Sequence, residues 1–461
     1  MVVPDGVTLT GSGSVRQGND GSLISSFALE KSDSKWRVVY SSDGIKPESI
    51  QLAFSDGKRL ISDSWRTTKT QLPWNAASKQ TIVDGMLSKC TLLPQATNIE
   101  ERPSAYVFYL TNFLFSGTQV VTTKFGKGTK GTLSRIDLDI DNYEVSLNWV
   151  PNYDRITQNI RDTRGIDVTA KLHIRTPKKP STEEIYDLVD NICALLSLAS
   201  GNNVVWVEAR TYGRRGQWIS SELLHGVTRP YSSMSLLDLN QGSNIKSLVE
   251  RGLPMLVEWD RRLATGANTT PLRNAIRLSL DSARGGTYLQ SRGLAAVIVI
   301  ELLSSRLAAT VGAEKLIPSR KFSKIRKRIR NLLREISPKV GIDSLVTDQL
   351  ANKISELNRP SFQVGISRLV SAANLIIEDA EIKRFLEVRN ALVHTGDFSS
   401  KNGINPVDQF FEILEFADRI LLAMLGYKGD YLSATSGWKS VGLNVQPSQE
   451  NSKYPAGHME L

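Results

Sequence analysis

The 461-residue sequence contains few of the residues that build disulfide frameworks or metal centres: two cysteines and four histidines. Cys90 and Cys193 lie far apart and lack the spacing of metal ligands, which argues against both a disulfide framework and a zinc site. We therefore expect a chain without a metal or other cofactor, in a reducing, cytoplasmic environment.

Long apolar segments are also missing from the sequence. The most apolar run, Leu294–Leu303, is interrupted by Glu301 and is shorter than the roughly 20 residues that span a bilayer. The first residues show no basic segment followed by an apolar core, so no signal peptide is expected. These absences predict a protein that stays in water.

Acidic residues are outnumbered, with 47 Asp and Glu against 57 Lys and Arg, which gives a formal net charge of +10. A basic balance favours a polyanionic partner such as RNA. The content of 40% hydrophobic and 23% charged residues is typical of a globular protein, and the length suits about two to four domains.

Up to about residue 175 the sequence alternates short β-branched and aromatic runs with turn residues. The predicted strands include Trp36–Tyr40, Tyr106–Phe115, Ile136–Ile140 and Glu144–Val150. Six of the eight tryptophans precede residue 230, and we expect most of them in a sheet core, with a recognition surface as the alternative. Residues 1–175 are predicted to form a β-rich N-terminal domain.

The next segment combines a helix and a strand. Ser181 and Glu184 form a capping box ahead of apolar residues with helical spacing, and this helix should end near Gly201. Val204–Val207 predicts one more strand, whereas residues 211–242 look rich in loops. Residues 176–242 are thus interpreted as an α-β extension and linker of the N-terminal half.

From about Asn244 the apolar spacing becomes helical. Helices are expected near residues 244–264, 287–309, 318–336, 379–394 and 406–425. Residues 243–435 then form an all-α domain, and the polar residues 436–461 form a mobile tail. The predicted fold class is α+β and multidomain, a β-rich domain followed by a helical bundle.

A candidate site lies on the 379–394 helix, where Arg389, Asn390 and His394 follow one another closely. The residues expected to share one helix face are Ile382, Phe385, Leu386, Arg389 and Val393. This face places an arginine in the apolar stripe. A guanidinium there needs either a carboxylate partner or an anionic ligand in a cleft.

His394 falls in the last turn before Gly396, the expected C-cap, where the helix dipole favours the protonated imidazole. Asn390 lies one turn earlier and is expected to orient that ring. Arg389 and His394 are about 140° apart on an ideal helix, so they do not converge within one subunit. A two-fold dimer, or a higher even oligomer, that packs this helix against its mate would bring two copies of each into one cleft. The pattern suits acid-base chemistry on a phosphodiester; the alternative is a paired surface arginine and a capping histidine.

A strongly basic helix is expected between Arg320 and Arg334, with eight basic residues and no acid. The candidate RNA-binding residues are Arg320, Lys321, Lys324, Arg326, Lys327, Arg328 and Arg330. A solvated charged face is an equally open interpretation. The apolar stripe of Phe322, Ile325, Ile329 and Leu332 is expected to pack in the bundle, which disfavours a membrane-surface helix.

The stretch Phe385–Gly396 resembles the Arg-x4-6-His signature of HEPN superfamily ribonucleases, including an Asn directly after the Arg. Leu289–Leu307, with Glu301 inside an apolar run, resembles the acidic motif helix of many HEPN proteins. A β-rich domain followed by the helix segment Asp190–Gly201 and a strand is similar to ApeA-type anti-phage HEPN proteins. The members that accompany nucleotidyltransferases often show His-x-Tyr, but Gly396 occupies the Tyr position here.

The resemblance implies catalytic roles for Arg389, Asn390, His394 and Glu301 in a homodimer. It implies a metal-independent endoribonuclease that cleaves RNA, such as tRNA, through attack of the 2′-hydroxyl. It also implies anti-phage defence by abortive infection, with an N-terminal domain that senses a phage-derived trigger. Two alternatives remain open: a non-catalytic HEPN dimerisation module whose β-domain binds a ligand or protein, and a ligand-binding sensor based on the tryptophan-rich domain.

Overall fold

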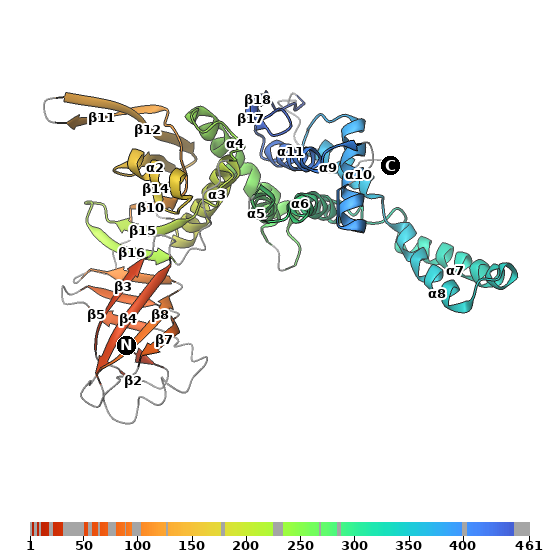
Figure 1. Cartoon of the computed structure of the whole chain (residues 1–461), viewed down its shortest axis with the longest axis horizontal. Helices are drawn as coiled ribbons and strands as arrows, with labels where there is room; N and C mark the ends of the chain where they lie inside the picture. Colours follow the sequence, from red (N-terminus) through yellow and green to blue (C-terminus); the bar gives the residue numbers. More distant parts are fainter. Residues whose placement is uncertain are drawn as a thin grey trace. The chain divides into compact units, whose positions relative to one another are not determined.

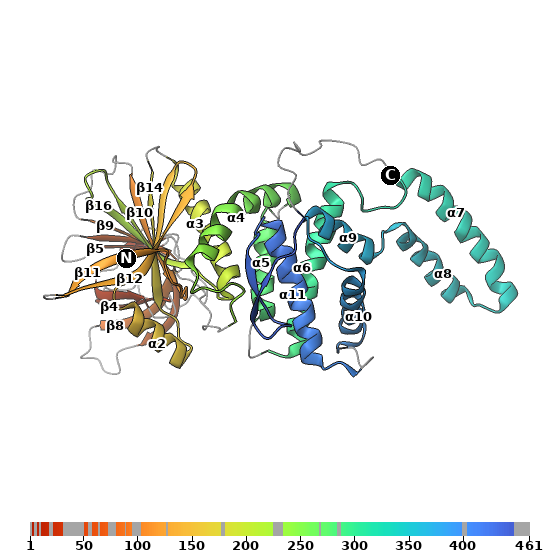
Figure 2. The ribbon, with the colours of Figure 1, turned by 90° about the horizontal axis from the view of Figure 1, so that it is seen from above.

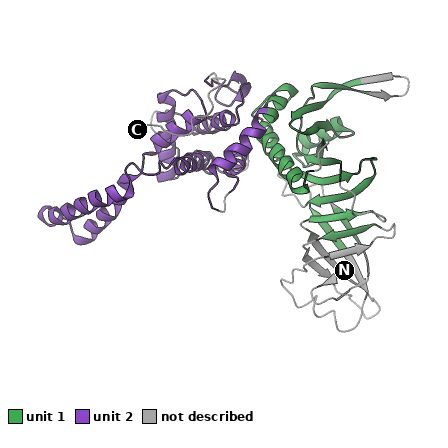
Figure 3. Cartoon of the chain, turned by 180° about the vertical axis from the view of Figure 1, so that it is seen from behind, with its two compact units in different colours: residues 1–250 green, residues 251–461 purple. Residues whose placement is uncertain are grey.

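The computed structural model describes residues 2–3, 7–8, 11–17, 22–30, 50–53, 58–62, 65–71, 80–87, 89–94, 103–125, 128–176, 180–224, 234–266, 269–283, 287–398 and 403–446. The chain divides into two compact units, residues 1–250 (unit 1) and 251–461 (unit 2), which Figure 3 shows in different colours. The predicted strand Trp36–Tyr40 lies outside the described residues.

Unit 1 is built on a ten-stranded antiparallel sheet with the order β11-β12-β13-β14-β10-β15-β16-β9-β6-β5 (Figure 1). Its strands are β5 (Ile50–Ala53), β6 (Arg59–Ser62), β9 (Lys89–Leu93), β10 (Ala105–Thr111), β11 (Gln119–Phe125), β12 (Gly128–Ile140), β13 (Tyr143–Trp149), β14 (Val168–Arg175), β15 (Trp206–Tyr212) and β16 (Trp218–Leu224). The predictions at Tyr106–Phe115, Ile136–Ile140 and Glu144–Val150 correspond to β10, β12 and β13.

A second sheet has the order β3-β4-β8-β7, and β1 pairs with β2. The strands are β1 (Val2–Val3), β2 (Val7–Thr8), β3 (Gly11–Gln17), β4 (Leu23–Glu30), β7 (Trp65–Gln71) and β8 (Gln80–Leu87). Together the sheets confirm that the N-terminal region is β-rich.

Helix α3 (Thr182–Ser200) provides the hydrophobic partner of the large sheet. The predicted capping box is present, because the Ser181 hydroxyl accepts from the Glu184 N–H and the Glu184 carboxylate accepts from the Ser181 N–H, each at 3.1 Å. Tyr186 stacks on the buried Trp206 at 5.3 Å between ring centroids. The helix ends at Gly201 with φ +65°, where a Cβ would lie 1.8 Å from the Met234 carbonyl oxygen, so only glycine fits.

Within the described part of residues 176–242, two strands that follow α3 belong to the large sheet. β15 pairs with β10, and β16 pairs with β9, so both strands lie in the interior of the strand order. β16 escaped prediction because its sequence, WISSELL, lacks an apolar alternation, and only Ser221 in it is buried. The boundary between the two units falls at residue 250, inside α4 (Gly242–Leu263).

A shorter helix also belongs to unit 1. Helix α2 (Tyr153–Thr163) follows β13 and stacks Tyr153 on Trp149, with ring centroids 4.0 Å apart. The Trp149 indole N–H donates to the Phe115 carbonyl oxygen at 2.8 Å. Trp149 and Trp206 therefore serve packing, as expected of most tryptophans in a sheet.

The described part of unit 2 is mainly helical, as the apolar spacing predicts. After α4 come α5 (Pro271–Ala283), α6 (Leu289–Thr310), α7 (Ser319–Ile336), η1 (Ser337–Val340), α8 (Ser344–Lys353), η2 (Ile354–Asn358), α9 (Phe362–Ala372), α10 (Asp379–Thr395) and α11 (Pro406–Met424). Figure 2 shows α5, α6 and α11 side by side.

Helix α6 is the central helix of this bundle. It contacts α5, α9, α10 and α11. With 22 residues it is longer than the Leu294–Leu303 run indicates, and among the described residues it is the one helix long and apolar enough to cross a membrane. Its place between four helices accounts for that apolar composition, since a core helix needs apolar residues on most of its surface.

Helices α7 and α8 form a hairpin that extends away from α5, α6 and α11 (Figures 1 and 2). No residue of α7 is buried. The expectation that its apolar stripe packs in the bundle is wrong for Leu332 and Ile325, which are 55% and 40% exposed. The other two residues of the stripe, Phe322 and Ile329, are half-buried. Amphipathic spacing showed where the stripe lies on the helix but not what covers it.

The expected tail from residue 436 contributes to unit 2 up to residue 446. β17 (Asp430–Ser433) pairs with β18 (Lys439–Gly442), and Val445 bridges to Leu375. The hairpin is held by Glu415 of α11, whose carboxylate accepts from the Tyr431 hydroxyl at 2.7 Å and from the backbone N–H of Thr435 at 2.8 Å. The polar residues here bind a buried carboxylate, which composition alone cannot distinguish from a solvated tail. Residues 447–461 lie outside the described residues.

Candidate functional site

Arg389 of α10 and Glu301 of α6 meet, although 88 residues separate them in the chain. The Nε and Nη2 groups of Arg389 donate to Oε1 of Glu301 at 2.9 and 2.5 Å. Its Nη1 donates to Oδ1 of Asn390 at 3.1 Å, and the guanidinium lies 5.0 Å above the centre of the Phe362 ring. Three of the four expected catalytic residues thus form one cluster.

Close packing of α6 against α10 positions this cluster. At Gly293 of α6 an added Cβ would approach Leu392 of α10 to 3.1 Å and Phe398 to 2.9 Å, so glycine permits the approach. The buried face of α10 consists of Ile382, Phe385, Val388 and Leu392. Arg389 borders this face, whereas Val393 is 42% exposed, so the buried stripe is rotated relative to the expected one.

The guanidinium of Arg389 keeps hydrogen-bonding capacity for a ligand. Arginine has five N–H donors, and the hydrogen bonds among the described residues use three of them. The remaining two are one on each Nη nitrogen. This is the fork that binds two oxygens of a phosphate or carboxylate.

Arg389 and Glu301 line a cleft of about 1040 Å³, which we call the Arg389 cleft. Its walls come from α6, α7, η2, α9 and α10 and the loops between them. The charged lining residues are the cations Lys315, Arg326, Arg359, Arg368 and Arg389 and the acids Glu301 and Glu314. The excess of cations favours an anionic ligand.

The rim of the cleft is held by hydrogen bonds to backbone groups. The buried Asn358 side chain accepts from the Ile317 N–H and donates to the Ile317 carbonyl oxygen, both at 2.8 Å. Arg368 donates to the Ala313 carbonyl oxygen at 3.2 Å. These contacts tie the α6–α7 loop to η2 and α9, which fixes the spacing of the cations.

Sequence reasoning missed Lys315, Arg359 and Arg368. They lie in two loops and on α9, without a motif or a local cluster that would single them out. Their shared feature is position in the folded chain, which only the packing of α6, η2 and α9 creates. The excess of basic residues is the one sequence signal that pointed to them.

The seven expected RNA-binding residues of α7 separate into three groups. Arg326 lines the Arg389 cleft. Arg330 donates to the Ala351 carbonyl oxygen at 3.1 Å and thereby joins α7 to α8. The exposed residues outside the cleft lining are Arg320, Lys321, Lys324, Lys327 and Arg328.

His394 is exposed in the last turn of α10 and is not part of the cleft lining. Gly396 is the C-cap, as expected, with φ +74° and its N–H donating to the Leu392 carbonyl oxygen. Among the described residues no hydrogen bond joins Asn390 to His394; the amide contacts Arg389 instead. A single chain therefore brings Arg389, Asn390 and Glu301 together, and leaves His394 outside.

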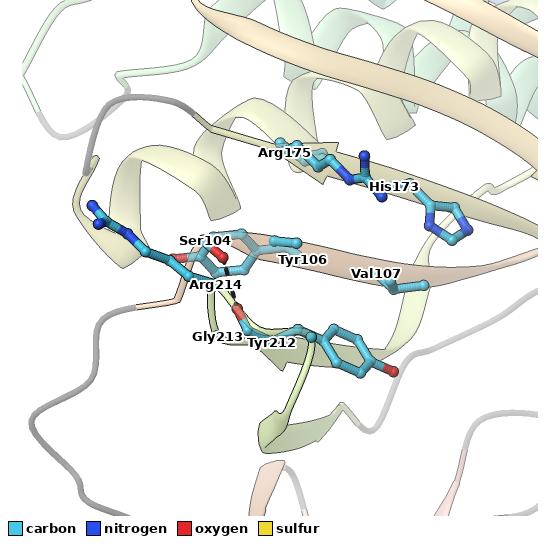
Figure 4. A pocket seen from close by; sticks show the side chains of 11 residues that line it. Ser104, Tyr106, Val107, His173, Arg175, Tyr212, Gly213 and Arg214 are labelled. Atoms are coloured by element: carbon cyan, nitrogen blue, oxygen red, sulfur yellow. Dashed lines mark hydrogen bonds between the residues drawn. The ribbon is translucent and has the colours of Figure 1, made fainter.

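A second hollow, of about 500 Å³, lies on the large sheet of unit 1, where β10, β14 and β15 run together. Figure 4 shows Arg175 extending along β14 towards His173, whereas Arg214 points away from both. Burial lowers the pKa of His173, and the nearby cations Lys171, Arg135 and Arg175 lower it further. In the described part of the chain no three His, Cys, Asp or Glu side chains gather as a metal-binding group.

Comparison with known proteins bears on unit 1. A sequence model of the YopA central domain matches residues 99–233, the segment that contains β10 to β16 with α2 and α3. Neither a curated protein nor a solved structure matches the chain. The segment around the second hollow is thus similar to the YopA central domain, while the Arg389 cleft lies outside the matched residues.

Proposed function

We propose that the chain is a metal-independent HEPN endoribonuclease whose active site includes the Arg389 cleft. The observation that carries the proposal is the pairing of Arg389 with Glu301 in the wall of a cleft with five cationic side chains. A guanidinium held on one side by a carboxylate, with donors left on the other, suits the stabilisation of charge on a phosphate.

The proposed reaction needs proton transfer and charge stabilisation only. The ribose 2′-oxygen attacks the adjacent phosphorus, its proton passes to a base, and the bond to the 5′-oxygen breaks as that oxygen takes up a proton. The products are a 2′,3′-cyclic phosphate and a free 5′-hydroxyl. Arg389 stabilises the phosphorane, and Arg326, Arg359 and Arg368 bind neighbouring phosphates.

His394 is the proposed proton carrier, and it comes from a second copy of the chain. Arg389 and His394 point in directions about 140° apart on α10, so one copy does not bring them together. A two-fold dimer would place the imidazole of one protomer at the Arg389 cleft of the other. The proposed substrate is RNA, tRNA included, and the proposed setting is anti-phage defence by abortive infection, with unit 1 as the sensor of a phage-derived trigger.

A non-catalytic HEPN dimerisation or interaction module is the second candidate. The exposed position of His394 outside the cleft lining favours it. In that case the helices dimerise, and unit 1 binds a ligand or protein through the region similar to the YopA central domain.

The test is cleavage of total cellular RNA in EDTA by wild type, His394→Ala and Arg389→Ala. Arg261→Ala, which removes an exposed arginine paired with Glu258 on α4, is the matched control. We expect 2′,3′-cyclic phosphate ends from wild type and the control, and loss of cleavage in the other two variants. If no protein cuts RNA, even with lysate from phage-infected cells, the interaction module is the better reading.

A further inference from the structure

The α7–α8 hairpin carries a concentration of exposed aliphatic side chains. Between residues 325 and 357 these are Ile325, Leu332, Ile336, Val340, Leu345, Val346, Leu350 and Leu357, each between 39% and 68% exposed. Large apolar patches on a folded surface mark the place where a partner or a membrane binds.

Helical geometry gathers the largest part of this surface on one side. Ile325, Leu332 and Ile336 follow one another at steps of seven and four residues, so they form one stripe on α7. Val346 and Leu350, four residues apart, form a stripe on α8. Each stripe lies about a quarter-turn from the contact between the two helices, and because the helices are antiparallel both face the same side.

The antiparallel pairing rests on side-chain contacts. Nε of Arg330 donates a hydrogen bond to the Ala351 carbonyl oxygen, and Nη2 of Arg334 lies 3.8 Å from Oδ1 of Asp348. Thr347 and Ala351 are the residues that α8 buries. The contact between the helices thus uses a different face of α8 from the one that carries Val346 and Leu350, and it leaves both stripes uncovered.

Cations border the exposed apolar side. Lys321 lies one turn before Ile325, and Arg328 one turn before Leu332, so both are direct neighbours of the stripe on α7. Both side chains are exposed, as is Lys324. The surface therefore combines aliphatic groups that avoid water with positive charge.

Three kinds of partner can be compared with this combination. A second copy that paired through the same face would bring its own α7 cations against Lys321, Lys324 and Arg328. RNA matches the charge, but its phosphates and sugars give exposed Ile and Leu side chains no apolar surroundings. A bilayer with anionic headgroups offers phosphates to the cations and acyl chains to the aliphatic groups.

We propose that the α7–α8 hairpin docks the protein on an anionic lipid bilayer, lying in the headgroup region with Ile325, Leu332 and Ile336 directed to the acyl chains. Lys321, Lys324 and Arg328 bind lipid phosphates in this arrangement, and Arg326 remains with the Arg389 cleft. The attachment is peripheral, because the hairpin is amphipathic and its opposite side is polar.

The test is flotation of the full-length protein with vesicles of phosphatidylglycerol and phosphatidylethanolamine, compared with vesicles of phosphatidylcholine alone. Wild type should float with the anionic vesicles only. The double variant Ile325→Ser, Leu332→Ser should lose about tenfold or more in binding, since two aliphatic side chains no longer enter the bilayer. Val311→Ser, Val257→Ser removes equally exposed aliphatic groups outside the hairpin and should float like wild type.

Other outcomes would overturn the proposal. If the Ile325→Ser, Leu332→Ser protein floats as well as wild type, the apolar stripe does not contribute to membrane binding. Failure of wild type to float, with the double variant changing the sedimentation coefficient of the free protein, would assign the surface to a second copy. Failure of wild type to float, with RNA affinity reduced in the double variant, would assign it to RNA. Circular dichroism of each variant verifies the fold.

Discussion

A single oxygen of Glu301, Oε1, accepts both hydrogen bonds that Arg389 donates to this carboxylate. The contact uses Nε and Nη2 and leaves a donor on each Nη nitrogen, while Asn390 and the Phe362 ring restrict the remaining movement of the guanidinium. The carboxylate thus fixes the orientation of the arginine and leaves its outer edge open to the cleft.

Glu301→Gln should lower RNA cleavage about tenfold or more, because a neutral amide holds the guanidinium less firmly where charge develops on the phosphate. Stability should change by less than about 1 kcal/mol, since the pair is partly exposed. Single-turnover cleavage and thermal unfolding measure the two effects. Glu258→Gln, which breaks an exposed pair with Arg261, is the control and should cleave like wild type.

Mixing two inactive variants tests whether the proposed site is shared. In a dimer of one Arg389→Ala and one His394→Ala protomer, one of the two composite sites keeps both wild-type residues. Random mixing should therefore restore about a quarter of wild-type cleavage, because half of the dimers are mixed and each has one intact site. If the mixture stays as inactive as its components, Arg389 of one protomer and His394 of the other do not form a shared site.

Asp418 of α11 should make unit 2 less stable as the pH rises. Burial raises its pKa from 3.8 to about 7, and its contact in the described structure is a hydrogen bond with Ser279 at 2.8 Å. The folded protein holds this proton more tightly than the unfolded chain does. The stabilisation is therefore complete below about pH 4, falls as the pH rises, and is lost once the pH passes 7. Asp418→Asn should remove this pH dependence. At pH 8 it should raise the free energy of unfolding by on the order of 2 kcal/mol.

Urea denaturation at several pH values measures the slope of the free energy of unfolding against pH. Asp408→Asn, an exposed carboxylate on the same helix, should retain the wild-type slope. An unchanged slope in Asp418→Asn would show that another group carries the dependence.

Glu415→Ala should destabilise unit 2 by about 2–4 kcal/mol, because it leaves several buried donors without an acceptor. The carboxylate accepts from Tyr431, Ser433 and Thr435, which together connect the β17–β18 hairpin to α11. Hydrogen exchange should show earlier opening of residues 430–442 than of α6. The half-buried Glu412, three residues away, provides the control. If Glu412→Ala and Glu415→Ala lower the free energy of unfolding equally, the hydrogen bonds to Glu415 have no specific role.

Local patterns predicted those elements whose signals are contained in a short stretch. The capping box at Ser181, the C-cap at Gly396 and the spacing of α10 each depend on neighbours within a few residues. β16 lacks such a signal, and one of its two pairing partners, β9, is distant in the chain. The same distinction applies to the site: Arg389 and Asn390 form a visible pair in the sequence, whereas Arg359 and Arg368 reach the cleft only through packing.

The strand order of unit 1 sets a condition on its formation during synthesis. β9 (Lys89–Leu93) is bordered by β16 (Trp218–Leu224), and β10 is bordered by β14 and β15, so central pairings join segments far apart in the chain. A ribosome must therefore release the chain past residue 224 before these edges close, and such long-range pairing is slow. Until residue 224 has emerged, β9 keeps one unpaired edge, to which a strand of another chain can add.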